Sequence, residues 1–478
     1  MFRRSEEPQS IRIGLYGDPA SGRKSLSEAL NGRIFYRSCD KRSFKFDVQI
    51  QPNTPPFMSV ITVDATQYRR NLDMEPALQA AESTSPSALC VVLTKLDLIP
   101  PGVCTARISL MGAKSHHAYL YGRDYLSISS VSGEGMEELQ TYIVNTFSPP
   151  QPSSSIFGSL SSFRNTFISM LIDTVVACFA LPVAHTTKNV DSELAAMPSD
   201  DAIDQLCKSA IASTWGTQLA QILKAPSPSD VPAHRVSDSL IVKWPTSSER
   251  ASMILAQHST SIPIPRVHHP HLKHLVMDFI DGEPLIESWH KMTWFMQFRV
   301  ACTLRRYVRQ LQSLKSSRIG GVDNGRIHGV LFGENSHGPF ASPIRFRQFC
   351  EVFVYDSWRS YVELHCSPGD PLPRLPQMRS CWDPVFVHGD LNMSNIILDR
   401  SNTLWIIDWA TAAYCPASLE SQSMRYFNDV MWPNNYHVSP HTWRRYRQFI
   451  AGPTDKEEDE FWDFLACNIS RAGGSHIL

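Results

Sequence analysis

Several common sequence signals are missing from this chain of 478 residues. The formal net charge is only −1, so the overall charge gives no reason to expect nucleic acid or an acidic membrane as a partner. Eleven cysteines are scattered without a C-x-x-C pair, a pattern typical of buried thiols in a reducing compartment. The N-terminal MFRRSEEPQS is not followed by an apolar segment, so it is not a signal peptide. These absences predict a cytoplasmic protein.

One long apolar segment is present at 167–184, with the sequence FISMLIDTVVACFALPVA. Its length lies at the lower limit for a membrane span, and it contains Asp173 and Pro182. A charge near the middle of a span is energetically costly. We therefore expect a buried core or inter-domain helix, and we do not expect a membrane as a partner.

The length suggests two or three domains, and Pro/Ser-rich stretches predict where they divide. Proline fixes φ and lacks a donor N–H, so the stretches at 148–162 and 224–234 are poor candidates for regular structure. The oligomeric state does not follow from the sequence. We expect an α/β domain at 1–147, a linker and helical segment at 148–234, a further domain at 235–450 and a C-terminal tail at 451–478.

The N-terminal domain alternates short apolar strands with helical patterns. We expect strands at 11–17, 58–65 and 87–97, with helices at 24–30 and 71–82. This alternation predicts an α/β fold with a parallel sheet, because parallel strands need helical crossovers between them.

Three motifs lie on this pattern in order: GDPASGRKS at 17–25, TKLD at 94–97 and SSVSGEGMEEL at 129–139. They resemble the phosphate loop, the guanine-reading loop and the base-supporting turn of a small GTPase-like P-loop domain. By that resemblance, the candidate guanine-nucleotide residues are Gly17, Gly22, Lys24, Ser25, Lys95 and Asp97.

The phosphate loop departs from the form G-x4-G-K-[ST], because Arg23 stands between Gly22 and Lys24. Only about 33 residues separate Ser25 from the strand at 58–65, which we expect to be too short for two strands and both switch segments. We therefore predict a shortened, degenerate GTPase-like domain without turnover, for which GTP is only a secondary candidate ligand. We also expect this region to be dispensable for activity elsewhere in the chain.

The strongest chemical pattern is FVHGDLNMSNIILD at 386–399, followed by LWIIDWA at 404–410. Phosphoryl transfer needs a carboxylate near the attacking hydroxyl, oxygen ligands for Mg²⁺ and a cation on the phosphates. Asp390 and Asn395 stand five residues apart on one predicted loop. Asp408 ends a second apolar strand thirteen residues later, so a hairpin would place it beside that loop.

This pattern resembles the aminoglycoside phosphotransferase family, particularly its fungal relatives. That family reads HGDLxxxN and then IDW, where protein kinases read HRDLxxxxN and DFG. The resemblance covers roughly residues 235–450 and implies a two-lobed α+β domain like that of protein kinases. It further implies that Asp390 is the catalytic base and that Asn395 and Asp408 hold Mg²⁺.

The resemblance extends upstream to SLIVKW at 239–244. This segment has the form of the strand whose lysine, here Lys243, binds the α- and β-phosphates of ATP. The family holds that lysine with a glutamate on the next helix. Glu249 is the only acidic residue between Lys243 and Asp278, so it is the available partner.

A hinge strand follows in HLVMDFIDGEPL at 274–285, which resembles the family's adenine-binding segment. The resemblance implies that Met277 to Phe279 supply backbone groups to adenine.

Two features depart from the family pattern. No glycine lies between Gly216 and Gly282, so the glycine-rich loop that covers the phosphates is absent. Glycine allows the closest approach of a backbone to phosphate. Ala410 stands where the family usually has glutamate after the tryptophan. Neither departure removes the expected base or a metal ligand.

These features predict an enzyme that uses ATP and Mg²⁺ to phosphorylate a hydroxyl of a small-molecule acceptor. The alternative is a catalytically weak pseudokinase or scaffold with a nucleotide-binding remnant, which the missing glycine loop favours. A protein kinase is disfavoured by Gly389 in place of Arg and by IDW in place of DFG. The insert at roughly 285–380 is expected to set the acceptor, which its composition does not name.

Overall fold

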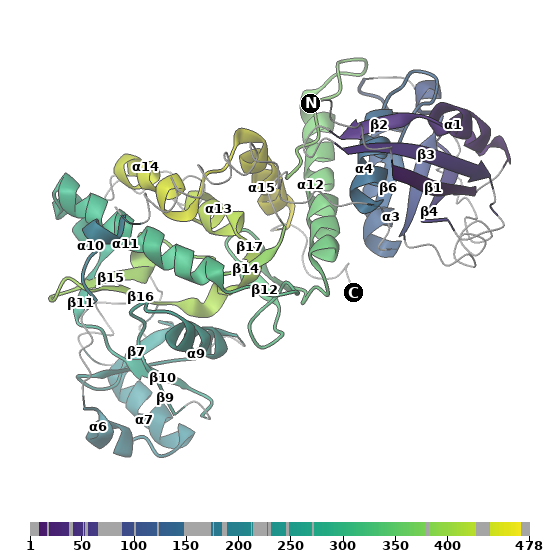
Figure 1. Cartoon of the computed structure of the whole chain (residues 1–478). Helices are drawn as coiled ribbons and strands as arrows, with labels where there is room; N and C mark the ends of the chain where they lie inside the picture. The colour runs from purple at the N-terminus through teal and green to yellow at the C-terminus, as the bar shows by residue number, and fades with distance from the viewer. Residues whose placement is uncertain are drawn as a thin grey trace, which may run out of the picture. The chain divides into compact units, whose positions relative to one another are not determined.

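A computed structural model of the chain forms two compact units (Figure 1). Unit 1 combines Met1–Ser169 with Gln348–Leu375, and unit 2 combines Met170–Arg347 with Pro376–Leu478. The structure describes residues 9–16, 19–37, 42–50, 52, 56–65, 88–99, 102–121, 124–147, 174, 176–183, 189–211, 213, 227, 231–244, 248–269, 272–378, 382–426 and 440–469.

The core of unit 1 is a six-stranded sheet. All neighbouring strands pair in parallel except the edge strand β2, which is antiparallel to β3. This confirms the α/β fold with a parallel sheet that the sequence predicts. In sheet order the strands are β2 (Ile34–Arg37), β3 (Arg42–Ile50), β1 (Gln9–Tyr16), β4 (Met58–Asp64), β5 (Ala88–Thr94) and β6 (Asp124–Ser127).

Helices cover both faces of this sheet, which explains why its central strands are continuous apolar runs. Helices α1 (Arg23–Leu30) and α4 (Met136–Phe147) pack in one buried cluster through Leu26 and Ile143. Helix α3 (Thr105–Tyr121) packs in a second cluster, where Leu110 is buried with residues of β4 and β5. The expected helix at 71–82 lies outside the described residues.

The segment between Ser25 and β4 is short. It holds two strands, because the hairpin of β2 and β3 needs few residues. Only residues 31–33 connect the end of α1 to β2. The compact connection agrees with a shortened domain, while the segment at 38–41 lies outside the described residues.

A segment from the expected C-terminal domain completes unit 1. Helix α12 runs from Pro343 to His365, and from Gln348 onward it belongs to this unit. The buried Tyr355 hydroxyl donates to the carbonyl oxygen of Ile108 at 2.6 Å. The loop after α12 adds two backbone hydrogen bonds with Val103, from Val103 N to Asp370 O and from Gly369 N to Val103 O. The boundaries at 147 and 235 therefore do not separate the two units.

This packing predicts an unusual response at Gly112, a glycine inside α3. A Cβ there would lie 2.5 Å from Tyr355 Oη, and the buried tyrosine is fixed by its hydrogen bond to Ile108. An exposed helical Gly→Ala change stabilises by roughly 1 kcal/mol, but we expect Gly112→Ala to destabilise by about 1–3 kcal/mol through overpacking. Chemical denaturation measures this difference. In a Tyr355→Ala background the same change should become neutral or stabilising, and a persistent destabilisation there would contradict the packing argument.

Unit 2 begins with an antiparallel four-stranded sheet of order β7-β8-β10-β9. Helix α7 packs on this sheet, where Ile203 shares a buried cluster with Leu240 and Val242. The elements are α6 (Asp191–Ala195), α7 (Asp200–Ile211), β7 (Ala233–Arg235), β8 (Leu240–Lys243), α9 (Glu249–Ser259), β9 (Val267–His268) and β10 (Leu275–Asp278).

The rest of unit 2 is built around helix α11, which is buried on one side, with short strand pairs that carry the HGDL and IDW segments. Strand β14 pairs with β17, β12 pairs with β13, and β15 lies between β11 and β16. The elements are β11 (Gly282–Pro284), α10 (Leu285–Ser288), α11 (Trp294–Ser313), β12 (Ile327–Gly329), β13 (Gly333–His337), β14 (Pro384–Val387), β15 (Ile396–Asp399), β16 (Leu404–Ile406), β17 (Ala413–Pro416), α13 (Ser418–Tyr426), α14 (Pro440–Ala451) and α15 (Lys456–Ile469).

The segment at 451–478, which we expected to be a tail, contains part of this packing. In α15, Phe461 and Trp462 are buried, and Asp463 forms an ion pair of 2.5 Å with Arg425 of α13. A run of buried aromatic side chains is typical of a docked helix. The described part of the segment is therefore structural.

The apolar segment at 167–184 is described at 174 and 176–183. There Val176 and Leu181 are buried, and the amide of Leu181 donates to Thr303 Oγ1 of α11 at 2.8 Å. Ala177, Cys178 and Pro182 are exposed, so this part is only partly buried. None of the helices in the described ranges combines the length and apolarity needed to cross a bilayer.

Candidate active site

The HGDL segment forms a loop directly after the buried strand β14. Gly389 takes a φ of 75°, and a Cβ there would lie 2.9 Å from the carbonyl oxygen of Thr411. Both the backbone conformation and the space require glycine at this position. The sharp turn it allows places Asp390 at the start of the loop.

Two amides hold the Asp390 carboxylate. Asn392 Nδ2 donates to Oδ1 at 2.7 Å, and Asn395 Nδ2 donates to Oδ2 at 2.8 Å. Burial nevertheless raises the pKa of Asp390 to about 7, although both amide hydrogen bonds favour the ionised form. A positioned carboxylate that titrates near neutral pH has the property required of a general base.

The hydrogen bond from Asn392 predicts a measurable pH effect. It stabilises the charged carboxylate of Asp390, so Asn392→Ala should raise the pKa of that group above about 7. The alkaline-rising limb of kcat against pH should therefore move to higher pH, with rates converging at the alkaline plateau. Asn402→Ala, in the turn after β15, serves as a matched control. An unshifted limb in Asn392→Ala would refute the assigned role of this hydrogen bond.

Lys243, Glu249 and Asp408 come together from three separate elements. Lys243 Nζ, at the end of β8, lies 2.8 Å from Glu249 Oε1 and 2.6 Å from Asp408 Oδ1. Burial opposes the charged forms, yet the ion pairs prevail: the pKa of Lys243 is raised and that of Asp408 is lowered. Lys243 and Asp408 are therefore held charged.

The short spacing between Lys243 and Glu249 is accommodated because α9 starts at the glutamate itself. Glu249 is 1% exposed at the first turn of that helix, where the helix dipole favours a negative charge. Asp408 follows β16 in a left-handed conformation with φ of 61°, and its side chain is 42% exposed. A ligand can thus reach the Asp408 carboxylate.

Asn395 and Asp408 fit the oxygen chemistry of Mg²⁺. The Asn395 amide nitrogen donates to Asp390, which leaves its oxygen as the end available to a cation. The main chain joins Asn395 to the residue before Asp408, because Ile407 N donates to Asn395 O at 3.0 Å. In the described part of the chain, no group of three or more His, Cys, Asp or Glu side chains could hold a metal. Two oxygen ligands suit Mg²⁺, which takes few from a protein.

The two hinge residues occupy different environments. Met277 is buried in the main core of unit 2, in the middle of strand β10. The amide of Phe279 donates to Ser239 O at 2.7 Å, and its ring lies under the Arg235 guanidinium, 4.1 Å from the ring centroid. The Phe279 N–H is therefore engaged within the sheet.

Sequence reasoning missed the residues that hold the HGDL loop. Glu420 of α13 is buried and accepts from the amides of His388 at 2.6 Å and Gly389 at 3.5 Å. Burial raises the pKa of Glu420 to about 7 and lowers that of His388 to about 4. Thr411 Oγ1 donates to the carbonyl oxygen of His388 at 2.9 Å. Nothing in the local sequence of α13 marks Glu420, because its role depends on a contact 32 residues away.

The N-terminal motifs form a separate set in unit 1. Asp97 accepts a hydrogen bond of 2.5 Å from the Ser129 hydroxyl, which brings the TKLD and SSVSG motifs together. Lys95 has a φ of 59°. The Thr94 hydroxyl donates to Ser21 O in the phosphate loop.

The remaining described residues of the phosphate loop differ in their exposure. Gly22 has a φ of 81° and a Cβ there would meet Thr94 at 3.1 Å, so glycine is required. Lys24 and Ser25, which follow it on α1, are exposed. Gly17 lies outside the described residues.

Comparison with known proteins identifies a family only for part of the chain. Residues 355–420 match the model of the phosphotransferase enzyme family, APH. This match includes Asp390, Asn395 and Asp408, and it confirms the predicted resemblance in the C-terminal region. A comparison with curated proteins gives no match.

Solved structures similar to the N-terminal region include two G domains and a translation elongation factor. The FeoB G-domain from Methanococcus jannaschii is 21% identical, with 29% of this chain and 97% of that chain covered and a TM-score of 0.22. The G domain of the T. maritima FeoB iron transporter is 16% identical, with 29% and 99% covered and a TM-score of 0.20. Translation elongation factor SelB from Methanococcus maripaludis is 18% identical, with 31% and 35% covered and a TM-score of 0.24.

Proposed function

We propose that the chain transfers a phosphoryl group from ATP, with Mg²⁺, to a hydroxyl of a small-molecule acceptor. The observation that carries this proposal is the Asp390 carboxylate, fixed by two amides and with a pKa of about 7. The family match over residues 355–420 supports a kinase-like phosphotransferase. The nature of the acceptor and the use of ATP belong to the proposal.

Each residue then has a defined task. Asp390 accepts the proton of the attacking hydroxyl, because its carboxylate is the positioned base. Asn395 and Asp408 would hold Mg²⁺, which when bound neutralises charge on the transferring phosphoryl group. Lys243 uses two of its three N–H donors on Glu249 and Asp408, and the third remains for a phosphate oxygen.

One observation favours a second candidate, a catalytically weak nucleotide-binding protein. The turn between β7 and β8 carries Ser237 and Asp238 instead of glycines, and Asp238 forms an ion pair of 3.4 Å with Arg235. A carboxylate at this turn does not attract phosphates. The complete set of Asp390, Asn395 and Lys243 supports the enzyme over this candidate.

The deciding experiment measures ADP release by the full chain with Mg²⁺ and ATP across a panel of sugars, amino alcohols and polyols. Acceptor-dependent ADP release that disappears in Asp390→Asn would support the phosphotransferase. ATP binding without transfer to any acceptor, and without an effect of Asp390→Asn, would favour the binding protein.

A further inference from the structure

The outer side of helix α11 carries a concentration of positive charge that the overall balance of the chain conceals. One side of the helix is buried through Val300, Leu304 and Leu311. Arg305, Arg306 and Arg309 follow within five residues near its C-terminal end. A net charge near zero therefore coexists with a local cluster of three arginines.

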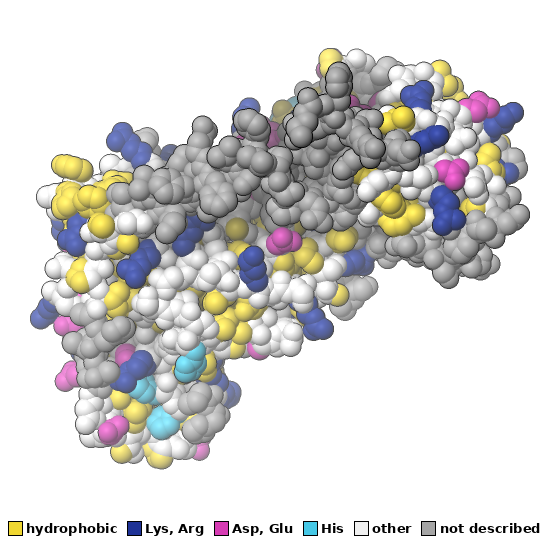
Figure 2. Space-filling view, viewed as in Figure 1, with side chains coloured by type: hydrophobic (Ala, Val, Ile, Leu, Met, Phe, Trp, Pro, Cys, Tyr) yellow, Lys and Arg dark blue, Asp and Glu magenta, His cyan; other side chains and the backbone are white. Residues whose placement is uncertain are grey.

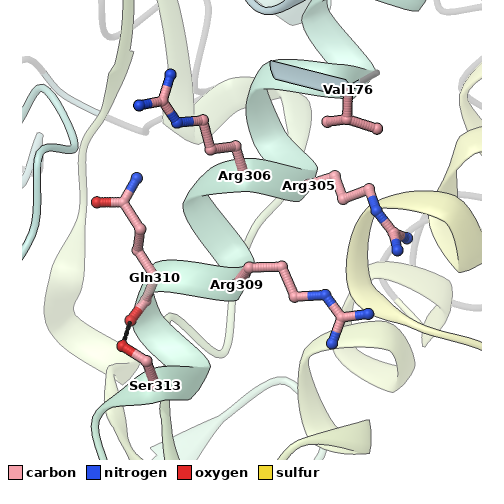
Figure 3. Close-up of a pocket in the computed structure, with 6 residues that line it drawn as sticks. All are labelled: Val176, Arg305, Arg306, Arg309, Gln310 and Ser313. Atoms are coloured by element: carbon pink, nitrogen blue, oxygen red, sulfur yellow. Dashed lines mark hydrogen bonds between the residues drawn. The ribbon is translucent and has the colours of Figure 1, made fainter. Parts of the chain in front are cut away.

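These arginines line a pocket of about 270 Å³ (Figure 3). Figure 3 shows the guanidinium groups of Arg305 and Arg309 on the same side of the helix. None of the lining residues belongs to the candidate active site. The lining consists of Val176, Arg305, Arg306, Arg309, Gln310 and Ser313.

Three side chains of the pocket have hydrogen-bond donors with no acceptor among the described residues. Arg306 and Arg309 are exposed, and neither forms an ion pair or side-chain hydrogen bond with another described residue. Gln310 Oε1 accepts from Ser261 N at 2.7 Å and from Ser261 Oγ at 3.0 Å, which fixes the amide. Its buried Nε2 has no hydrogen-bond acceptor among the described residues. In Figure 3 the Arg309 guanidinium extends to the same side of the helix as that of Arg305, while Arg306 and Gln310 extend to the other side, so an anion would pair first with Arg309 and Arg305.

Arg305 is held in place at the edge of this pocket. Its Nη1 donates to Phe449 O at 2.6 Å, and its guanidinium lies 5.1 Å from the centroid of the Phe449 ring. A guanidinium fixed by a carbonyl and an aromatic ring loses little further freedom when a ligand binds. The pocket thus combines one preorganised arginine with two exposed ones.

We propose that this pocket binds a phosphate monoester. Guanidinium groups match the geometry of phosphate oxygens, and a phosphate monoester offers three acceptor oxygens and more negative charge than a carboxylate with its two. A volume of about 270 Å³ also leaves room for part of the group that the phosphate esterifies. This ligand is bound at a site additional to that proposed for ATP.

Two sources share this chemistry, a soluble phosphomonoester and a phosphorylated lipid headgroup. Trp294 stands eleven residues before Arg305, or about three helical turns, so the two lie on the same side of α11. Trp294 is 76% exposed and Phe295 is 46% exposed. Figure 2 shows hydrophobic side chains gathered at the α10–α11 corner of unit 2. Exposed aromatic residues beside arginines also suit a membrane surface, so the experiment separates the sources.

The first test measures binding of the full chain to inositol 1,4,5-trisphosphate by calorimetry. The second measures sedimentation of the full chain with phosphatidylcholine vesicles that either contain or lack phosphatidylinositol 4-phosphate. Arg306→Gln/Arg309→Gln removes two exposed charges and should weaken binding at least about tenfold, because charge-assisted hydrogen bonds are lost. Ser313→Phe fills the pocket without changing its charge and should weaken binding similarly. Lys315→Gln/Arg318→Gln removes the same charge outside the pocket and should have no effect.

The outcomes distinguish a soluble phosphate ligand, a lipid headgroup and the absence of a phosphate site. Binding of the soluble phosphate that both pocket variants weaken, and the control does not, supports the site with a soluble ligand. Binding restricted to phosphoinositide vesicles, with the same dependence on the pocket and a further loss in Trp294→Ser, supports the site with a lipid headgroup. No binding of either probe, or equal losses in the pocket and control variants, would overturn the proposal.

Discussion

Phosphoryl transfer is expected to fall by roughly 10²- to 10⁴-fold when Asp390 is replaced by asparagine, because the acceptor hydroxyl loses its positioned base. Asparagine has almost the same shape, its single side-chain oxygen can still accept from one of the two amides, and Asn395 Nδ2 also donates to the backbone oxygen of residue 390 at 3.0 Å. The loop should therefore keep its geometry. Steady-state kcat with the best acceptor measures the effect, with ATP affinity as the parallel readout.

The matched control for this variant is Asp281→Asn, an exposed carboxylate whose ion pair with Arg400 is 3.5 Å long. It removes the same charge from the surface of unit 2 and should leave kcat within a factor of two or so, because exposed ion pairs contribute little. Unchanged activity in Asp390→Asn would disprove the role of Asp390 as the base.

The same variant should alter the pH dependence of stability. The pKa of Asp390 rises from its ordinary value of 3.8 to about 7 in the folded chain, so the folded state binds the extra proton between these values. The favourable contribution is complete below about pH 3.8 and is lost as the pH rises through about 7. Denaturation of Asp390→Asn should therefore show a smaller loss of stability between pH 5 and pH 8, if two-state unfolding holds for unit 2.

The sequence alone was enough to predict those features that depend on residues close together in the chain. The apolar runs of β1, β4 and β5 predicted the central strands, because strands buried on both faces need continuous hydrophobic side chains. The spacing of Asp390 and Asn395 placed both on one loop, since a few residues decide a tight turn. The partner of Lys243 was predicted by elimination, because no other acid was near in the sequence.

Contacts between residues far apart in the sequence could not be predicted from these local patterns. Tyr355 and Ile108 are 247 residues apart, and no periodicity indicates that α12 completes the N-terminal unit. Glu420 lies in a helix of otherwise uncharged buried residues, and its value to the catalytic loop exists only after folding. The hairpin of β2 and β3 was not among the strands expected at 11–17, 58–65 and 87–97.

The packing of α12 also changes the expectation that the N-terminal region is dispensable. Residues 348–375 share unit 1 with residues 1–169, so a deletion of 1–150 would expose the buried side chains of Phe353, Tyr355 and Trp358. Large exposed apolar surfaces favour aggregation. Loss of activity in such a deletion would therefore report on folding and would not show that nucleotide at Asp97 controls catalysis.

Replacement of Asp408 by alanine should remove the dependence of ATP binding on Mg²⁺ and weaken binding by roughly 10²-fold. A metal ion contributes several kcal/mol of charge stabilisation, and each 1.4 kcal/mol corresponds to about a tenfold change in affinity. The fold should survive, because Lys243 keeps its 2.8 Å ion pair with the buried Glu249. Titration of ATP with and without Mg²⁺ measures both effects.

The direction of the change distinguishes Asp408 from an ordinary ion-pair partner of Lys243. If its only task were to pair with the lysine, alanine would free the ammonium for the phosphates, and ATP would bind as tightly or more tightly without Mg²⁺. If Asp408 holds the cation, the variant should bind ATP weakly and equally in both conditions.

Glu249→Gln provides the comparison, since it disturbs the lysine while leaving Asn395 and Asp408 in place. That variant should weaken ATP binding but retain the Mg²⁺ dependence. A wild-type chain that binds ATP equally with and without Mg²⁺ would instead favour the nucleotide-binding protein, because the cation would then have no part in the complex.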